Sequence, residues 1–395
     1  MSSVSGFIHR PGVHCGSTAL RDLAESCAGV LLSEAMCFGL GAGLGFAYVA
    51  SPGVSPSRGF CGRAPYLEPH FFLHLDISFS WRNSPLSWEE LCQHVDAGVP
   101  ILALTDLYYL DYYASTVHFG GHAVVAAGYL PATGAGKAAE DGSPAAAASA
   151  SGSDGSGSRP GRGPGGTVLL ADTAWPDLQE VPYARFRQAM HSLAPPFPVD
   201  GQWTPVPRFG IAEGTLPRAV RAALATCARS YLHSPAPPEL VRLGVEHYGI
   251  SGLRTMAATL PSWIEVPDFA WCCRFAYQMI EKRGTGGSAF RRLYAAFLRE
   301  ARTLVPEIPP VAIAEMERAA ALWSEAATLF RELAVTTQPP PGPPASTAAG
   351  ATAASTAPPG PPPAARVAGT LRRISDLLLE AASREEEALT LVARL

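Results

Sequence analysis

Hydrophobic residues recur at helical spacing in two stretches near the N-terminus. In the first, apolar side chains lie three or four positions apart from Cys15 until Gly29, which predicts an amphipathic helix. In the second, Ser87 is followed three positions later by Glu90, a capping box that begins a helix ending at Gly98. The pattern then changes to continuous apolar runs, which predict strands.

These apolar runs have the length of buried strands: ILALTDL (101–107), HAVVAAGYL (122–130) and TVLLADT (167–173). We expect the last two to pair as an antiparallel hairpin with Leu130 opposite Thr167. This register brings His122 and Asp172 to the same end of the hairpin, away from its loop. A slip of one residue would turn Asp172 to the other face, so the sequence predicts the shared end but not the contact.

The second half of the chain has helical periodicity, with predicted helices at 217–232, 238–248, 268–283, 288–304, 311–335 and 366–394. Two low-complexity segments, 131–166 and 338–365, lack the apolar residues that would offset the entropy of ordering, so we expect both to be disordered. The prediction is an α+β protein. A domain at 1–210 contains an antiparallel sheet with 131–166 as a long loop, and an α-helical domain at 211–395 carries its last helix on a Pro-rich linker.

Composition narrows the class of protein. The 395 residues are 47% hydrophobic, carry a net charge of −4 and contain no block of Lys and Arg, so neither nucleic acid nor a membrane is an expected partner. The N-terminus lacks the apolar region of a signal peptide, and we expect a cytoplasmic protein. The eight cysteines form no CxxC pair, which argues against a disulfide framework and a zinc site.

Cys15, at the predicted helix start, is the candidate nucleophile. A thiol attacks well only as a thiolate, and the positive end of a helix stabilises that charge. A nucleophile also needs a base within hydrogen-bond reach and a third group that orients the base. His122 and Asp172 supply these parts on two adjacent predicted strands, in the order found in papain-like enzymes. The sequence therefore favours a catalytic Cys15 over a buried structural cysteine.

Further residues are candidates for contacts with an oxyanion or a substrate: His9, His14, Asp106, Tyr108 and Tyr109. His9 can donate to an oxyanion beside the Cys15 backbone N–H, and is otherwise an ordinary loop histidine. The tyrosine-rich segment before the histidine strand either lines a pocket for polar, amine-bearing molecules or packs into the core.

No metal or bound cofactor is expected. His118 and His122 have the i, i+4 spacing of a metal pair, but the glycines between them argue against a helix. The alternating glycines of FGLGAGLGF (38–46) do not have the GxGxxG spacing, and we expect a close-packed turn near the site. GTGGSAF (284–290), ahead of Arg291, suits either an anion or an ordinary turn between helices.

The N-terminal part resembles the butirosin biosynthesis protein H N-terminal family through HCGSTALRDL, SEAMCFGLGAGLGF, PILALTDLYYLDYY and GHAVVAAGY followed by LLADT, over roughly residues 10–190. The helical remainder, with RGTGGSAFRRLYAAFLREA, is similar to the domain of unassigned function that commonly follows. The resemblance implies a papain-like fold used as an acyltransferase, which moves an aminoacyl group from an acyl carrier protein thioester to an aminoglycoside amine. It implies Cys15 as nucleophile, His122 as base and Asp172 as orienting residue.

The expected function is transfer of an acyl or aminoacyl group through a Cys15 acyl-enzyme. The expected partners are an acyl carrier protein, whose phosphopantetheine carries the substrate, and a small-molecule amine acceptor. Two alternatives stay open. The same site can serve a cysteine peptidase or amidase that uses water as acceptor, and a non-catalytic binding protein can retain the same fold. The long insert and the Pro-rich break depart from the family pattern and affect how a carrier protein would dock.

Overall fold

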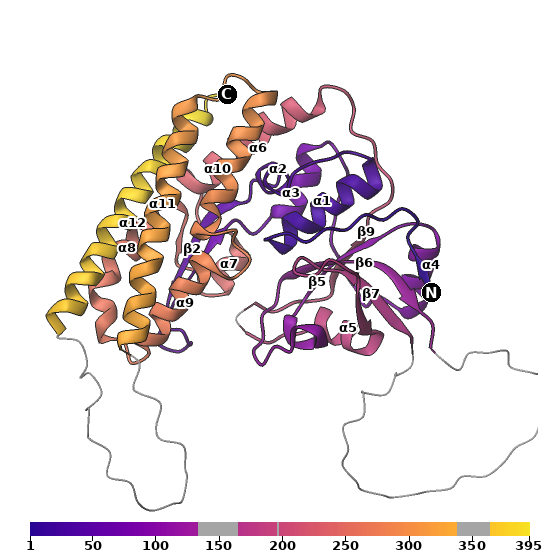
Figure 1. The fold of residues 1–395 in the computed structure, drawn as a ribbon, viewed down its shortest axis with the longest axis horizontal. Helices are drawn as coiled ribbons and strands as arrows, with labels where there is room; N and C mark the ends of the chain where they lie inside the picture. Colours follow the sequence, from indigo (N-terminus) through magenta and orange to yellow (C-terminus); the bar gives the residue numbers. More distant parts are fainter. Residues whose placement is uncertain (133–164, 196, 338–363) are drawn as a thin grey trace, which may run out of the picture. The chain divides into compact units, whose positions relative to one another are not determined.

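The computed structural model describes residues 1–132, 165–195, 197–337 and 364–395, which form two compact units (Figure 1). The first unit contains Met1–Leu31 and Ser80–Gly210, and the second contains Leu32–Phe79 and Ile211–Leu395. The two segments expected to be disordered, 131–166 and 338–365, lie almost entirely outside the described residues. Mixed sheet and helix confirm the predicted α+β class.

The units divide the chain differently from the expected domains at 1–210 and 211–395. The later boundary recurs after Gly210, but the segment Leu32–Phe79 belongs with the helical unit. This segment carries the FGLGAGLGF glycines, so the turn expected near the site lies in the second unit. A Cβ at Gly39 would lie 2.0 Å from the Phe297 ring, so the glycine permits close packing between two helices of that unit.

The first unit is built on an antiparallel sheet with strand order β4-β9-β5-β6-β7-β8, in which β1 also pairs with β6. The strands are β1 (Ser2–Ser3), β4 (Arg82–Asn83), β5 (Ile101–Thr105), β6 (His122–Leu130), β7 (Thr167–Ala171), β8 (Gln179–Pro182) and β9 (Gln202–Pro205). The helices are α1 (Cys15–Ala28), α4 (Trp88–Asp96) and α5 (Tyr183–Met190), with short 3-10 turns η1 (Leu107–Tyr109) and η2 (Asp111–Tyr113). Figure 1 shows α1 and α5 on opposite sides of the sheet.

One face of this sheet packs against α4 and α5. Alternate residues of β5 and β6 point into this core, among them Ala103 and Val124, where they meet Phe186 and Trp203. Ser87 caps α4 by accepting a hydrogen bond from the Glu90 backbone N–H at 3.0 Å, as the capping box predicts. The sheet is therefore a packed platform whose strand ends can hold side chains in fixed positions.

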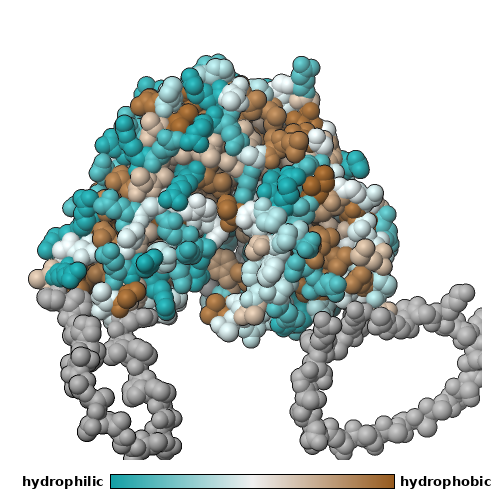
Figure 2. Space-filling view, in the orientation of Figure 1, coloured by the Kyte–Doolittle hydropathy of each residue, from teal (hydrophilic) through white to brown (hydrophobic). Residues whose placement is uncertain are grey.

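The second unit is mainly helical and contains a small antiparallel sheet of order β10-β2-β3. Its strands are β2 (Leu44–Ala50), β3 (Arg58–Arg63) and β10 (His247–Tyr248), and its helices before residue 260 are α2 (Glu34–Leu40), α3 (Leu67–His74), α6 (Thr215–His233), α7 (Pro238–Arg242) and α8 (Gly249–Thr259). From residue 260 follow η3 (Leu260–Glu265), α9 (Phe269–Glu281), η4 (Ser288–Phe290), α10 (Arg291–Leu304), α11 (Pro310–Thr336) and α12 (Ala364–Val392). On the face drawn in Figure 2, hydrophilic side chains and smaller apolar groups intermingle.

The helix predicted at 238–248 is present only over its first part, Pro238–Arg242. The helix α7 ends at Arg242, because Gly244 adopts a left-handed backbone conformation (φ 84°) and the chain then enters β10. The other predicted helices correspond to α6, α9, α10, α11 and α12 within a few residues. Across the described parts of the chain, no helix combines the length and apolar character that a membrane crossing requires.

GTGGSAF forms the turn before α10 rather than an anion site around Arg291. The Arg291 side chain is fully buried and ion-paired with Glu385 of α12, whose carboxylate oxygen lies 2.9 Å from Nε. The negative charge that this arginine binds is therefore supplied by the chain itself.

Candidate active site

Cys15 is the first residue of α1, and His14 caps the helix immediately before it. The Nδ1 atom of His14 accepts a hydrogen bond from the Ser17 backbone N–H at 3.3 Å. This cap places the half-buried Cys15 at the positive end of the helix macrodipole, where a thiolate is stabilised. The structure thus gives the candidate His14 a role in starting the helix.

His122 opens β6, and Asp172 directly follows β7. The Nε2–H group of His122 donates to both carboxylate oxygens of Asp172, at 3.0 and 2.9 Å, and both side chains are buried. The His122 side chain also hydrogen-bonds with the Cys15 side chain. Because Nε2 is bound to Asp172, Nδ1 is the ring nitrogen that remains for the thiol. Cys15, His122 and Asp172 thus form a continuous chain of hydrogen bonds.

A β-bulge makes the contact between His122 and Asp172 possible. The structure confirms the expected pairing of Leu130 with Thr167, but the register shifts by one residue between Ala126 and Gly128. Without the shift, Asp172 would stand opposite Val125, on the face away from His122. After the shift, Val125 pairs with Ala171, the last residue of β7, and extending this register by one residue brings Asp172 level with Val124, on the same face as His122. The bulge therefore turns the carboxylate toward the imidazole.

Two tyrosine hydroxyls complete the surroundings of Asp172. Tyr112 donates to Oδ2 at 2.6 Å, and Tyr113 donates to Oδ1 at 2.9 Å. Both residues lie in the tyrosine-rich segment, but the residues predicted as candidates were Tyr108 and Tyr109. The signal was the repeated tyrosine pair in YYLDYY, but the pattern could not indicate which pair points inward.

These contacts determine which groups are charged. Burial alone would lower the pKa of His122, but the negative charges of Asp172 and Cys15 raise it to about 10. Burial alone would raise the pKa of Asp172, but the positive charge on His122 and hydrogen bonds from the imidazole and both tyrosines hold it below its usual range. At neutral pH the site therefore contains an imidazolium at His122 paired with the Asp172 carboxylate, beside the Cys15 side chain.

His9 occupies a different place from the one expected of an oxyanion donor. Its Nδ1 donates to the Asp22 carboxylate at 2.5 Å, and its Nε2 donates to the Trp175 carbonyl oxygen at 2.8 Å. Burial lowers the pKa of His9, but the Asp22 carboxylate and these hydrogen bonds raise it overall. Both ring nitrogens are thus bound within the protein. His9 ties α1, which carries Asp22, to the turn that follows Asp172.

Asp106 is also bound within the protein rather than open to a substrate amine. Its fully buried carboxylate accepts hydrogen bonds from the backbone N–H groups of Tyr108 and Phe119 at 3.0 and 2.9 Å. It also accepts from His118 Nδ1 and Ser192 Oγ, both at 2.6 Å. Since His118 and His122 bind different aspartates, their i, i+4 spacing does not produce a metal pair.

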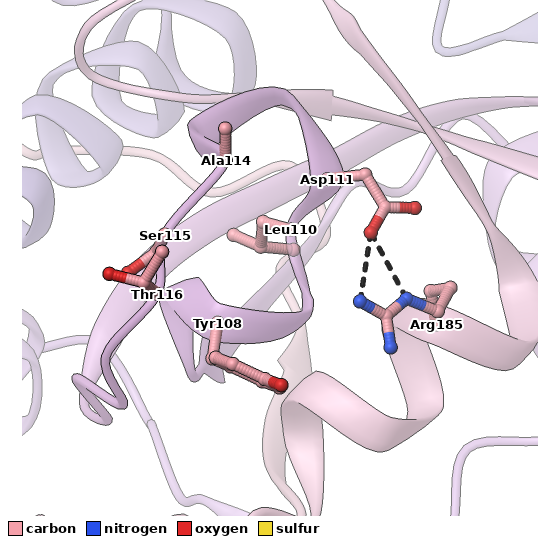
Figure 3. A pocket seen from close by; sticks show the side chains of 7 residues that line it. All are labelled: Tyr108, Leu110, Asp111, Ala114, Ser115, Thr116 and Arg185. Atoms are coloured by element: carbon pink, nitrogen blue, oxygen red, sulfur yellow. Dashed lines mark hydrogen bonds and ion pairs between the residues drawn. The ribbon is translucent and has the colours of Figure 1, made fainter. Parts of the chain in front are cut away.

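Tyr108 and Tyr109 lie on the same segment, where Tyr108 is exposed and Tyr109 packs against the core. The Tyr108 ring lies against the His118 ring in a tilted arrangement with 4.2 Å between centroids, and the Arg185 guanidinium lies 5.2 Å from the centre of the Tyr109 ring. Arg185 also binds Asp111, with Nη2 at 2.8 Å from the carboxylate (Figure 3). A hollow of about 420 Å³ beside this ion pair is lined by Tyr108, Leu110, Asp111, Ala114, Ser115, Thr116 and Arg185.

Comparison with known families accounts for most of the chain. Residues 184–392, more than half of the chain, match the domain of unknown function DUF4872. The chain belongs to the DUF4872 family. Residues 14–135 match the model described as butirosin biosynthesis protein H, N-terminal, which confirms the resemblance expected from the sequence. A search of curated proteins found none that matches the chain.

The two family matches do not follow the structural units. The butirosin biosynthesis protein H N-terminal match contains Cys15 and His122, but Asp172 lies between the two matches. The DUF4872 match begins within α5 of the first unit. The third member of the hydrogen-bonded chain is therefore assigned by the structure and not by either family model.

In this DUF4872 protein, we expect the rate at which iodoacetamide alkylates Cys15 to change less than about threefold between pH 8 and pH 6.5. A thiol with an ordinary pKa loses about tenfold in thiolate per pH unit in this range. Because the pKa of His122 is raised to about 10, its imidazolium stabilises negative charge on the Cys15 sulfur throughout this range. The measurement is peptide mass spectrometry of timed alkylation, with Asp172→Asn as the comparison. If the alkylation rate of the unmodified chain fell about tenfold per pH unit, that result would contradict an imidazolium at His122.

The same pair affects stability. Because the folded pKa of His122 is raised from 6.5 to about 10, its contribution is complete below pH 6.5 and is lost as pH rises through 10. Because the pKa of Asp172 is lowered, its contribution is complete above the ordinary carboxyl range and is lost in acid. The ion pair therefore stabilises the fold most between the ordinary carboxyl range and pH 6.5, where both contributions are complete.

Proposed function

We propose that this protein is a cysteine acyltransferase, which moves an acyl or aminoacyl group from an acyl carrier protein thioester to a small-molecule amine. The observation that carries the proposal is the position of His122, which hydrogen-bonds with Asp172 on one side and Cys15 on the other. The match to the butirosin biosynthesis protein H N-terminal model supports a biosynthetic role.

The first step would form the acyl-enzyme. The Cys15 thiolate attacks the thioester carbonyl carbon, a new C–S bond forms, and the bond to the phosphopantetheine sulfur breaks. His122 gives its proton to the departing thiol, while Asp172 holds the ring in place. Exchange of one thioester for another is nearly isoenergetic, which suits a thiolate nucleophile.

The second step would transfer the acyl group to the amine. The amine nitrogen attacks the acyl carbonyl, neutral His122 accepts its proton, and the Cys15 thiolate leaves as the amide forms. The site is then restored to its thiolate and imidazolium charges. In the hydrolase alternative, water takes the place of the amine with the same movement of protons.

The test is intact-protein mass spectrometry after mixing the chain with an aminoacyl-loaded carrier protein or an aminoacyl-N-acetylcysteamine thioester. We expect a mass gain equal to the aminoacyl group on Cys15, and its discharge to be accelerated at least about tenfold by an added polyamine. Discharge at equal rates with and without amine would favour the hydrolase. A reactive Cys15 that never gains the acyl mass would contradict both enzymes.

A further inference from the structure

The segment from Asp106 to Phe119 forms a loop closed at its neck. The Leu107 backbone N–H donates to the Phe119 carbonyl oxygen at 3.1 Å. The Asp106 carboxylate joins both sides of the neck, because it binds the backbone N–H groups of Tyr108 and Phe119. This loop enters from β5 and leads into β6, whose first residue is His122. Its conformation is therefore fixed beside the candidate site.

The inner side of this loop surrounds Asp172. Besides the two hydroxyl bonds, the Tyr112 and Tyr113 rings meet the Trp175 ring nearly edge-on, with 5.8 and 6.2 Å between centroids. The Tyr113 ring also meets the His122 ring edge-on at 5.6 Å. Each carboxylate oxygen of Asp172 thus faces the imidazole and one phenol.

We propose that Tyr112 and Tyr113 are positioning residues that hold Asp172 as a carboxylate and thereby fix the orientation of His122. A carboxylate that accepts two phenol hydrogen bonds is a weaker base, so it leaves the proton on the imidazole. Burial raises the pKa of both phenols, and the negative charge of Asp172 raises it further. Both hydroxyls therefore remain protonated and act as donors. The proposal deepens the proposed function and rests on its thiol site, but not on the identity of the acyl donor.

Asp172 is surrounded by titratable groups from several elements of the first unit. His122 faces it from β6 and Tyr112 and Tyr113 face it from η2, while Cys15 of α1 acts through His122. His9 contributes through the backbone of Asp172 and is itself bound to Asp22. Removing either phenol hydroxyl therefore acts on the Asp172–His122 pair, and at Tyr113 it also acts on Cys15, whose charge contributes to the raised pKa of Tyr113.

The experiment measures iodoacetamide alkylation of Cys15 between pH 4 and pH 9 in the full chain, with no acyl substrate. We expect Tyr112→Phe and Tyr113→Phe each to lower the rate near neutral pH by about tenfold, and the double variant by about 100-fold. Because Asp172 loses donors, its pKa should rise and the acid limb of the profile should move upward by about one pH unit per hydroxyl.

Tyr109→Phe is the matched control, because this tyrosine lies on the same loop and its ring packs under Arg185 instead. It should leave the profile unchanged. Thermal unfolding distinguishes a positioning role of Tyr112 and Tyr113 from a purely structural one. A purely structural role would lower the melting temperature of the variants and slow alkylation equally at every pH. An unshifted acid limb in the double variant, or the same shift in Tyr109→Phe, would overturn the proposal. Because alkylation needs no acyl donor, failure of acyl transfer would leave this result interpretable.

Discussion

Replacement of Cys15 by alanine is expected to lower the rate of acyl transfer by about 10⁴-fold or more, the scale seen when a covalent nucleophile is removed. The reason is that the proposed mechanism places the acyl group on this sulfur, and Cys15 is the thiol that hydrogen-bonds with His122. The fold should remain intact, because Cys15 is half-buried and alanine suits a helix start. The measurement is amide formation with a carrier-bound donor, together with intact mass for the acyl-enzyme.

Cys92→Ala supplies a matched control for this experiment. Cys92 is also half-buried and lies in the same unit, on α4. However, burial and the nearby Asp96 carboxylate raise the pKa of Cys92 to about 11, so its thiol stays protonated near neutral pH. We expect Cys92→Ala to retain the full rate of transfer. Equal rates in Cys15→Ala and the unmodified chain would rule out the acyl-enzyme, whatever the product.

The parts of the site could be predicted from the sequence because each depends on local chemistry. A cysteine before an apolar helical stretch indicates a helix start, and the apolar runs containing His122 and Asp172 indicate adjacent strands. The pairing of Leu130 with Thr167 followed from the same pattern. The contact itself could not be predicted, because it depends on a bulge of one residue at Ala126–Gly128. Gly128 is compatible with a bulge, but a strand glycine equally marks a close approach of another backbone, so it does not specify the extra residue.

Side-chain direction in short turns was the second limit. Tyr108 and Tyr109 resemble Tyr112 and Tyr113 in composition and spacing, yet only the later pair reaches Asp172 among the contacts described. The difference comes from the 3-10 geometry of η1 and η2, which no periodic pattern of hydrophobic residues specifies.

The membership of Leu32–Phe79 in the helical unit was the third limit. Its strand β2 pairs with β3 on one side and on the other with β10, which lies about 200 residues later in the chain. Sequence patterns identify a strand by its own residues and give no information on so distant a partner. The helical unit is therefore assembled from both halves of the chain, and its stability depends on contacts far apart in sequence.

Replacement of Glu385 by alanine is expected to destabilise the helical unit by about 3–5 kcal/mol, because it leaves a buried charge without its partner. The Glu385 carboxylate receives hydrogen bonds from Arg291 Nε and Nη2, both at 2.9 Å, from Trp323 Nε1 at 2.7 Å and from the Tyr231 hydroxyl. Both charged side chains are fully buried. The measurement is calorimetric or denaturant unfolding of the full chain.

Glu386→Ala is the control, since Glu386 is the next residue on α12 and its ion pair with Arg254 is largely exposed. Its loss should cost at most about 1 kcal/mol, because water screens and solvates both partners. A double replacement of Arg291 by methionine and Glu385 by leucine should recover much of the stability, since it removes both buried charges together. Equal destabilisation by Glu385→Ala and Glu386→Ala would contradict the argument. The expected contrast makes α12 part of the core of the unit, although residues 338–363, which directly precede it, lie outside the described structure.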